Sequence, residues 1–261
     1  MKPLVFIYAG HHGPQGTVLE GPYGTSVELH ASLFEKIFEK VQRIYGEHLV
    51  EVLSKAIPAQ TLLVIPSGAA STLDTVFSDE QIATIQKSVE QGMQLYASCG
   101  SAYWLAENRV WHGQSAKGKI NLFPGTAIGP LSPCSDSHHH APFLHKSVAI
   151  KTSRVFRVLL SGGGTFMTNA SVKVLATYEE ETLQQHAKSK EWEKAIISCT
   201  YGKGKAILSM VHPEEGLNDV DVFALHHLFA HRTENWQEIH DSLSSEEMRI
   251  DLLTEILEEF T

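Results

Sequence analysis

The chain has 261 residues, of which 43% are hydrophobic, and it carries a formal net charge of -9 with a pI near 5.9. This length allows one large α/β domain around a buried sheet, and we expect a single domain over residues 1–261. The acidic balance and the lack of clustered Lys and Arg argue against nucleic acid or an anionic membrane as a partner, because binding phosphates needs clustered cations.

The cysteine content and the N-terminal residues bear on the compartment. Cys99, Cys134 and Cys199 are widely spaced and odd in number, which favours free thiols in a reducing compartment over a disulfide framework. The apolar run after Lys2 ends at Gly10 without a signal-peptide cleavage pattern. No segment approaches the roughly 20 apolar residues of a membrane span. We therefore expect a soluble, cytoplasmic protein.

The first hundred residues alternate short apolar runs with amphipathic stretches, a pattern typical of βαβ units and a parallel sheet. In chain order, the pattern predicts a strand over 4–8, a helix over 27–44, a strand over 48–53, a strand over 61–66, a helix to residue 90 opened by a Ser78–Gln81 capping box, a strand over 93–97 and a helical stretch over 102–106.

The second half begins with an irregular, proline-containing region over 113–146, which we expect to be a long ordered loop that bears function or acts as a lid. Further strands are expected over 155–160, 172–178, 195–201 and 206–210, with a hairpin turn at 201–205, and helices over 221–232 and 245–260.

Cys99 stands where a predicted strand runs directly into a helix. A nucleophile on such a tight bend needs small residues two positions away on each side, and Ala97 and Ser101 occupy them. The helix N-terminus after Cys99 would lower the thiol pKa and offer amides to an oxyanion. On this segment alone, a buried core cysteine explains the pattern equally well.

A second segment favours catalysis. His212-Pro213-Glu214 follows a predicted strand, so the imidazole could accept the thiol proton while the carboxylate two residues later fixes its tautomer. A histidine and a glutamate in this spacing, together with the upstream cysteine, predict a Cys99-His212-Glu214 triad.

These two segments resemble class I glutamine amidotransferases, whose elbow is Gly-x-Cys-x-Gly and whose His and Glu lie in a His-Pro-Glu. More specifically, the chain resembles the N-terminal domain of biotin-protein ligases and its stand-alone relatives. Four stretches carry this resemblance over almost the whole chain: 121–130 (NLFPGTAIGP), 161–166 (SGGGTF), 174–178 (VLATY) and 202–208 (GKGKAIL). The resemblance implies a flavodoxin-like, three-layer fold with a mostly parallel central sheet and helices on both faces.

The resemblance also implies the roles of the site residues. Cys99 would be the nucleophile, His212 the base and Glu214 its orienting partner. Gly68 and Gly100 would supply oxyanion amides, and we place Gly125 and Gly163 in the substrate-binding part of the site. The chain departs from the family pattern at Ala97 and Ser101, which replace the elbow glycines, and at Ser67, where Gly-Gly is expected after Pro66.

Two related activities are disfavoured. The DJ-1-type relatives place a histidine directly after the elbow cysteine, where this chain has Gly100, and the adenylate-binding loop of a biotin ligase is absent.

The His-rich patch over 134–145 lacks the ligand spacing of a metal site. The Gly-rich segments at 10–13 and 162–164 match no phosphate-binding fingerprint. We expect no metal and no cofactor, close backbone approach at the glycines, and a core position for Cys199.

Two functions remain open at this point. The first is a cysteine amidase or amidotransferase-like hydrolase that attacks a small-molecule amide, with glutamine as the family default. The second is a non-catalytic binding or regulatory module that contacts a biotin-pathway or synthase partner protein, because a fold alone never proves an activity.

Overall fold

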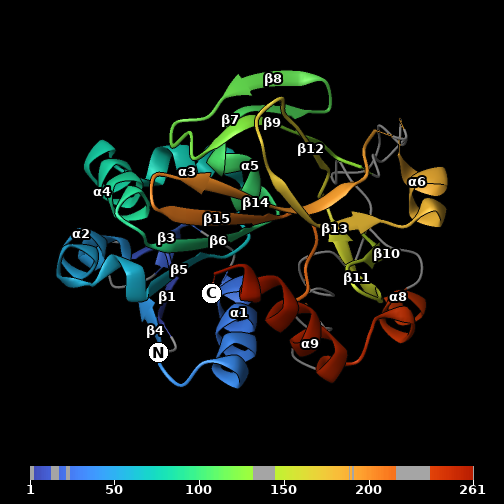
Figure 1. The fold of residues 1–261 in the computed structure, drawn as a ribbon, viewed down its shortest axis with the longest axis horizontal. Coiled ribbons are helices and arrows are strands. Elements are labelled where there is room, and N and C mark those ends of the chain that lie inside the picture. Colours follow the sequence, from blue (N-terminus) through green and yellow to red (C-terminus); the bar gives the residue numbers. More distant parts are fainter. Residues whose placement is uncertain are drawn as a thin grey trace.

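The computed structural model describes residues 3–12, 18–21, 24–131, 145–187, 189, 191–215 and 236–260. Its centre is a nine-stranded sheet with strand order β11-β10-β13-β14-β15-β6-β5-β1-β4 (Figure 1). In that order the strands are Val155–Ser161, His145–Lys151, Lys173–Tyr178, Lys194–Tyr201, Gly204–Ser209, Gln94–Ser98, Thr61–Ile65, Leu4–Tyr8 and Val41–Ile44.

This sheet is mixed, so the expectation of a mostly parallel sheet is wrong. The pairs β15–β6, β6–β5, β5–β1 and β1–β4 are parallel, whereas the four pairs from β11 to β15 are antiparallel. Connection length is the cause for two of the four antiparallel pairs. Two residues join β14 to β15 and three join β10 to β11, and such short links allow only antiparallel neighbours. The hairpin at residues 201–205 is confirmed.

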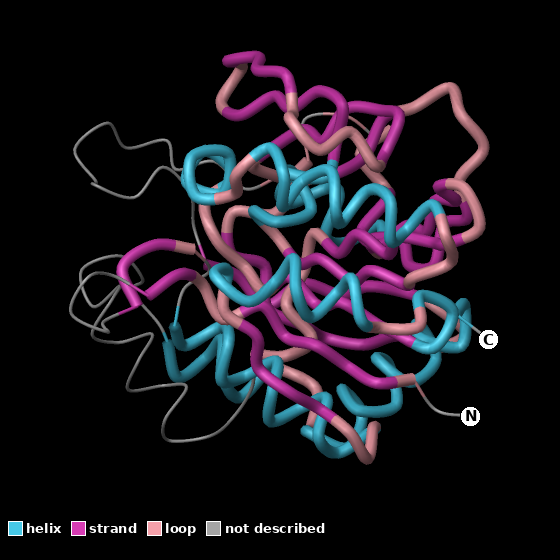
Figure 2. The backbone as a smooth tube through the Cα atoms, turned by 90° about the vertical axis from the view of Figure 1, so that its left-hand side faces the viewer, coloured by secondary structure: helices cyan, strands magenta, loops and turns pink. Residues whose placement is uncertain are grey.

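Helices cover both faces of the sheet, as expected, and Figure 2 shows them on either side of the strands. One face packs under α2, α3, α4 and α5, and the other under α1 and α9. The helices are α1 (Gly24–Ile37), α2 (Gly46–Lys55), α3 (Ala70–Val76), α4 (Asp79–Glu90), α5 (Gly100–Leu105), α6 (Glu180–His186), α8 (Trp236–Ser242) and α9 (Glu246–Leu257), with 3-10 turns η1 (Pro58–Gln60) and η2 (Glu258–Phe260).

A second sheet packs beside α5 and has the strand order β12-β9-β7-β8 (Figure 1). Its strands are Thr165–Met167, Phe123–Gly129, Ala106–Trp111 and Gln114–Lys117, and a separate hairpin pairs β2 (His11–His12) with β3 (Val18–Glu20). The expected loop over 113–146 is therefore wrong where β8 and β9 lie. Pro124 had argued against a strand, but it lies where the β7–β9 register shifts, a position that tolerates proline.

Two early elements also differ from expectation. Residues 48–53 lie in α2, where Leu49 and Leu53 are buried one helical turn apart, so the apolar run was ambiguous between strand and helix. The helix expected over 27–44 ends at Ile37, and β4 follows. The expected helix was too long because the apolar spacing continues across the turn that separates the two elements.

The remaining expectations are mostly confirmed. Ser78 caps α4 with both hydrogen bonds of a capping box, and α9 with η2 accounts for the expected C-terminal helix. The helix expected over 221–232 lies outside the described residues, and the single domain over 1–261 stays a prediction. Among the described residues, no helix combines the length and apolarity needed to cross a bilayer.

The capping box gives a stability test. Ser78 Oγ accepts from the Gln81 amide at 3.2 Å, and the Gln81 side chain accepts from the Ser78 amide at 2.9 Å. We expect Ser78→Ala to lower the free energy of unfolding by about 1 kcal/mol, because an N-terminal amide of α4 loses its acceptor. Urea denaturation measures it. Ser71→Ala, on the exposed side of α3, is the control, and equal midpoints for both variants would contradict the expectation.

Candidate active site

Cys99 lies on a strained bend between β6 and α5. Its backbone has φ 48° and ψ -115°, a conformation that residues other than glycine rarely adopt. Two contacts hold the bend. The Cys99 amide donates to the Ser209 carbonyl at 2.7 Å, and the Ser101 hydroxyl donates to the Pro66 carbonyl at 2.5 Å. The neighbouring strands β15 and β5 therefore fix the position of the thiol.

Gly68 and Gly100, the two expected oxyanion residues, lie against each other beside the bend. A Cβ atom at position 100 would overlap the carbonyl oxygen of Gly68. Only glycine allows this close approach, which brings the segment after β5 to the first turn of α5.

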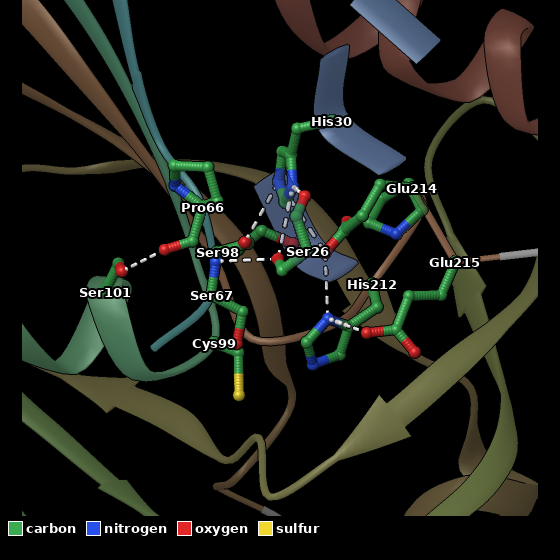
Figure 3. Close-up of polar contacts among 12 residues, drawn as sticks. Ser26, His30, Pro66, Ser67, Ser98, Cys99, Ser101, His212, Glu214 and Glu215 are labelled. Carbon is green, nitrogen blue, oxygen red and sulfur yellow. Dashed lines mark hydrogen bonds and ion pairs between the residues drawn. The ribbon is translucent and has the colours of Figure 1, made fainter. Parts of the chain in front are cut away.

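His212 is brought to the same place by strand pairing. It follows β15, which lies parallel to β6 with Ser209 opposite Ser98, and its amide donates to the Leu159 carbonyl at 2.9 Å. The imidazole is buried, with 2% of the residue exposed, and Figure 3 shows it beside Cys99. Residues 113 positions apart in sequence are thus neighbours at the carboxyl ends of adjacent strands.

Two buried carboxylates contact the imidazole. His212 Nδ1 lies 2.8 Å from Glu214 Oε1 and 3.2 Å from Glu215 Oε1. The shorter contact is the one expected from the sequence, and Arg249 Nη1 fixes this turn by donating to the Pro213 carbonyl at 2.9 Å. His212 Nε2 is buried without a hydrogen-bond partner of normal geometry among the described residues, which leaves it available to the thiol.

The charges around His212 set its protonation. Burial lowers its pKa, but the negative charges of Glu215, Cys99 and Glu214 together outweigh burial and raise the pKa well above 6.5. The close approach of the Cys99 side chain to the imidazole acts in the same direction. The protonated form of His212 therefore persists to higher pH than in a free imidazole.

The Gly-rich segment after β11 lines the site with its carbonyl groups. Cys99 Sγ lies 3.1 Å from the Ser161 carbonyl oxygen, within reach for the thiol to donate to it. The next three carbonyls accept from Tyr103 Oη at 3.3 Å, from the Leu131 amide at 2.8 Å and from Tyr178 Oη at 2.8 Å. The expected close backbone approach at these glycines is present, since a Cβ on Gly163 would overlap the Met210 carbonyl.

Tyr103 and Tyr178 stay neutral in this environment. Burial and, secondarily, the charge of Cys99 raise the pKa of both phenols above 10. Both side chains can therefore act as permanent hydrogen-bond donors that hold the segment next to the sulfur.

Other expected residues lie elsewhere. Gly125 packs against Phe123 and Met167 and lines an open hollow of about 610 Å³ that none of Cys99, His212 and Glu214 lines. The structure therefore does not bring Gly125 to the triad. Cys199 is buried in β14, where burial raises its pKa to about 12, as expected for a core thiol. Cys134 and the His-rich patch, except for the buried His145, lie outside the described residues.

A metal is the main alternative for the same side chains. His212, Glu214 and Glu215 offer three ligand atoms within 4.8 Å of one another, and imidazole with carboxylates is a donor set that zinc accepts. The 2.8 Å contact between His212 Nδ1 and Glu214 also fits a direct hydrogen bond, which needs the proton that a metal would displace.

Sequence reasoning missed Glu215 and His30. Glu215 is next to the triad glutamate and shares its histidine. His30 lies in α1, fully buried, with Nε2 at 3.6 Å from Glu214 Oε1 (Figure 3). A signal was present, because His30 interrupts the otherwise apolar buried stripe that includes Val27 and Phe34.

The chain resembles known proteins in sequence. A family model described as "Biotin-protein ligase, N terminal" matches residues 19–261. The biotin-protein ligase of Schizosaccharomyces pombe is 26% identical over 199 residues, which are 69% of this chain and 30% of that ligase. The chain thus spans less than a third of that relative.

Two solved structures share the fold. A glutamine amidotransferase matches with a TM-score of 0.53 at 16% identity, over 81% of this chain and 90% of the other. A GH42 β-galactosidase from G. stearothermophilus matches with a TM-score of 0.52 at 14% identity, over 99% of this chain and 30% of the other. The amidotransferase-like α/β fold is confirmed, and at these identities the likeness extends to the fold alone.

The carboxylate of Glu215 allows a test of what raises the pKa of His212. We expect Glu215→Gln to lower the pKa of His212, because Glu215 is the largest of the charges that raise it. A charged His212 with a raised pKa stabilises the fold below pH 6.5, and this contribution is lost as the pH rises through the folded pKa. In the variant that loss should therefore begin at lower pH.

NMR titration of the imidazole signals measures the shift. Glu51→Gln is the control, because Glu51 lies on the exposed surface of α2. An unchanged His212 pKa in the Glu215 variant would show that this carboxylate does not influence the imidazole.

Proposed function

The chain belongs to the biotin-protein ligase N-terminal family, and from that membership and the geometry of the site we propose that it is a cysteine hydrolase of the amidotransferase type. Cys99 is the nucleophile, His212 the base and Glu214 the residue that orients the base. The observation that carries the proposal is the convergence of a strained Cys99 bend and the His212–Glu214 pair at the ends of β6 and β15.

The proton positions give the order of events. Glu214 accepts from His212 Nδ1–H, so Nε2 is the nitrogen that can take the thiol proton. The thiol must first turn from the Ser161 carbonyl toward Nε2. The thiolate then attacks the amide carbon, and the imidazolium protonates the leaving nitrogen as the C–N bond breaks.

The second half of the reaction releases the product. His212 takes a proton from water while the water oxygen attacks the thioester carbon, and the sulfur leaves and recovers the proton. We place the oxyanion against backbone amides near Gly68 and Gly100, whose close packing leaves no side chain between the two segments.

The substrate class follows from this chemistry. A Cys-His-Glu site suits a carboxamide or related acyl group, and glutamine is the proposed first substrate because of the amidotransferase-like fold. That fold also occurs in a β-galactosidase, so the site supports the carboxamide class, and the fold supports only glutamine as the first amide to test. The rival proposal is a non-catalytic module for a biotin-pathway or synthase partner, and the family membership supports it equally.

Alkylation of Cys99 separates the two proposals. We expect iodoacetamide to label Cys99 at neutral pH at least about tenfold faster in the native protein than in His212→Ala, because the imidazole takes the thiol proton. Glu214→Gln should slow labelling more than Glu215→Gln, since Glu214 is closer to Nδ1. Peptide mass spectrometry gives the rate for each cysteine.

Cys199 is the internal control and should stay unlabelled while the fold is intact. Labelling should also survive EDTA, because the proposed base uses a protonated Nδ1 and no metal. A Cys99 rate that is the same with and without His212 would favour the binding module, and loss of labelling with EDTA would favour the metal site.

Turnover is the second test. We expect the protein to release ammonia from glutamine or another primary amide, and Cys99→Ser to lose about 10³-fold or more of this activity because the hydroxyl is a weaker nucleophile. A coupled ammonia assay measures the rate, and mass spectrometry of the quenched reaction detects the acyl group on Cys99. Cys199→Ser is the control, and equal ammonia release by both variants would exclude the Cys99 mechanism.

A further inference from the structure

The triad carboxylate has a second histidine on its far side. His30, on α1, is fully buried, and its Nε2 lies 3.6 Å from Glu214 Oε1, the same oxygen that contacts His212 Nδ1 at 2.8 Å. Figure 3 shows Glu214 between the two imidazoles. The carboxylate therefore links a base that faces the thiol to a histidine that the reaction proposed above does not use.

The orientation of His30 is fixed by its other contacts. Nδ1 lies 2.7 Å from the Ser26 carbonyl, which can only accept, so Nδ1 carries a proton. Nε2 is left to face Ser98 Oγ at 3.1 Å and the carboxylate. Ser26 is held in turn, because its hydroxyl accepts from the Ser67 amide at 3.0 Å.

These contacts connect His30 to the nucleophile from two directions. Ser98 ends β6 and directly precedes Cys99. Ser67 follows Pro66, the residue after β5, whose carbonyl accepts from Ser101. A histidine that only filled space in the core would need none of these alignments.

A buried carboxylate needs such a partner. Burial alone raises the pKa of Glu214, whereas His30 and then His212 lower it, and the net direction is downward. Glu214 must stay ionised to accept the Nδ1 proton of His212, and an isolated charge in this setting would be costly. Glu215 also contacts His212, but no described contact joins it to His30.

We infer that His30 is a positioning residue of this site, which keeps the Glu214 carboxylate aligned so that Glu214, and not Glu215, orients His212. The site is then a chain of four side chains, Cys99–His212–Glu214–His30. The inference rests on the proposed function, because it assigns His30 a role in the activation of Cys99.

A double-mutant cycle tests this role. His30→Leu should slow the labelling of Cys99 by iodoacetamide about three- to tenfold, within the range that coupled neighbours show. In a Glu214→Gln background the same change should have less than about a twofold effect, because the residue through which His30 acts is already altered. An equal slowing in both backgrounds, or none in the native one, would overturn the inference. His48→Leu, on the exposed surface of α2, is the control.

A spectroscopic signature separates positioning from a general loss of packing. In protein with ¹⁵N-labelled histidine, His30→Leu should move the His212 Nδ1 resonance in the same direction as Glu214→Gln does. Unchanged His212 resonances in a folded variant would overturn the inference. If His30→Leu does not fold, His30→Gln, which has a similar reach, replaces it in both measurements.

A further NMR measurement keeps His30 and changes Glu214. Glu214→Gln should shift the His30 Nε2 resonance, and an unchanged resonance would contradict the contact between them.

Failure of the inference is distinct from failure of the proposed function. If His212→Ala leaves the rate unchanged, the proposed function is wrong. If His212→Ala and Glu214→Gln slow labelling but His30→Leu does not, only the role of His30 is wrong.

Discussion

The carboxylate of Glu214 is the charge around which the site is built. It lies out of water between two imidazoles, and it holds one nitrogen of His212 so that the other faces Cys99. A negative charge in such a place is costly unless polar partners contact it, so the elements that supply those partners must be placed accurately. Helix α1 supplies His30, the turn after β15 supplies His212, and Arg249 of α9 holds the carbonyl between His212 and Glu214. The packing of both helices onto one face of the sheet therefore sets the geometry around Glu214.

The sequence predicted the parts of the site that follow strand ends. Cys99 and His212 stand where apolar runs stop, and a glutamate two residues after the histidine has one obvious partner. His30 escaped prediction because its neighbours in α1 have the spacing of an ordinary buried helix face, and the partners that join it to the site, Ser98 and Glu214, are 68 and 184 residues away. Contacts over such distances depend on how α1 docks against the sheet, which local patterns do not describe.

The sequence likewise predicted some elements of the fold and missed others. Strands and helices with strong periodicity or a capping box lie where expected, whereas residues 48–53 form a helix that an apolar run of six could not distinguish from a strand. The mixed character of the sheet was not predicted because the parallel half comes first in the chain, and a hairpin such as 201–205 fixes the relative direction of only the two strands that it joins. The β7–β9 pairing was hidden by a proline at an irregular position.

The parallel pairing of β6 and β15 has a consequence for how this site could diversify. Cys99 and His212 are spaced by the hydrogen-bond ladder between two central strands, with Ser98 opposite Ser209, and not by the connections that follow them. Since a shift of one residue would turn every side chain of a strand to the opposite face, this alignment is locked by the whole core. The segments beyond the strand ends are under no such constraint. Related chains could therefore exchange one acyl group for another by altering those segments while the distance between sulfur and imidazole stays constant.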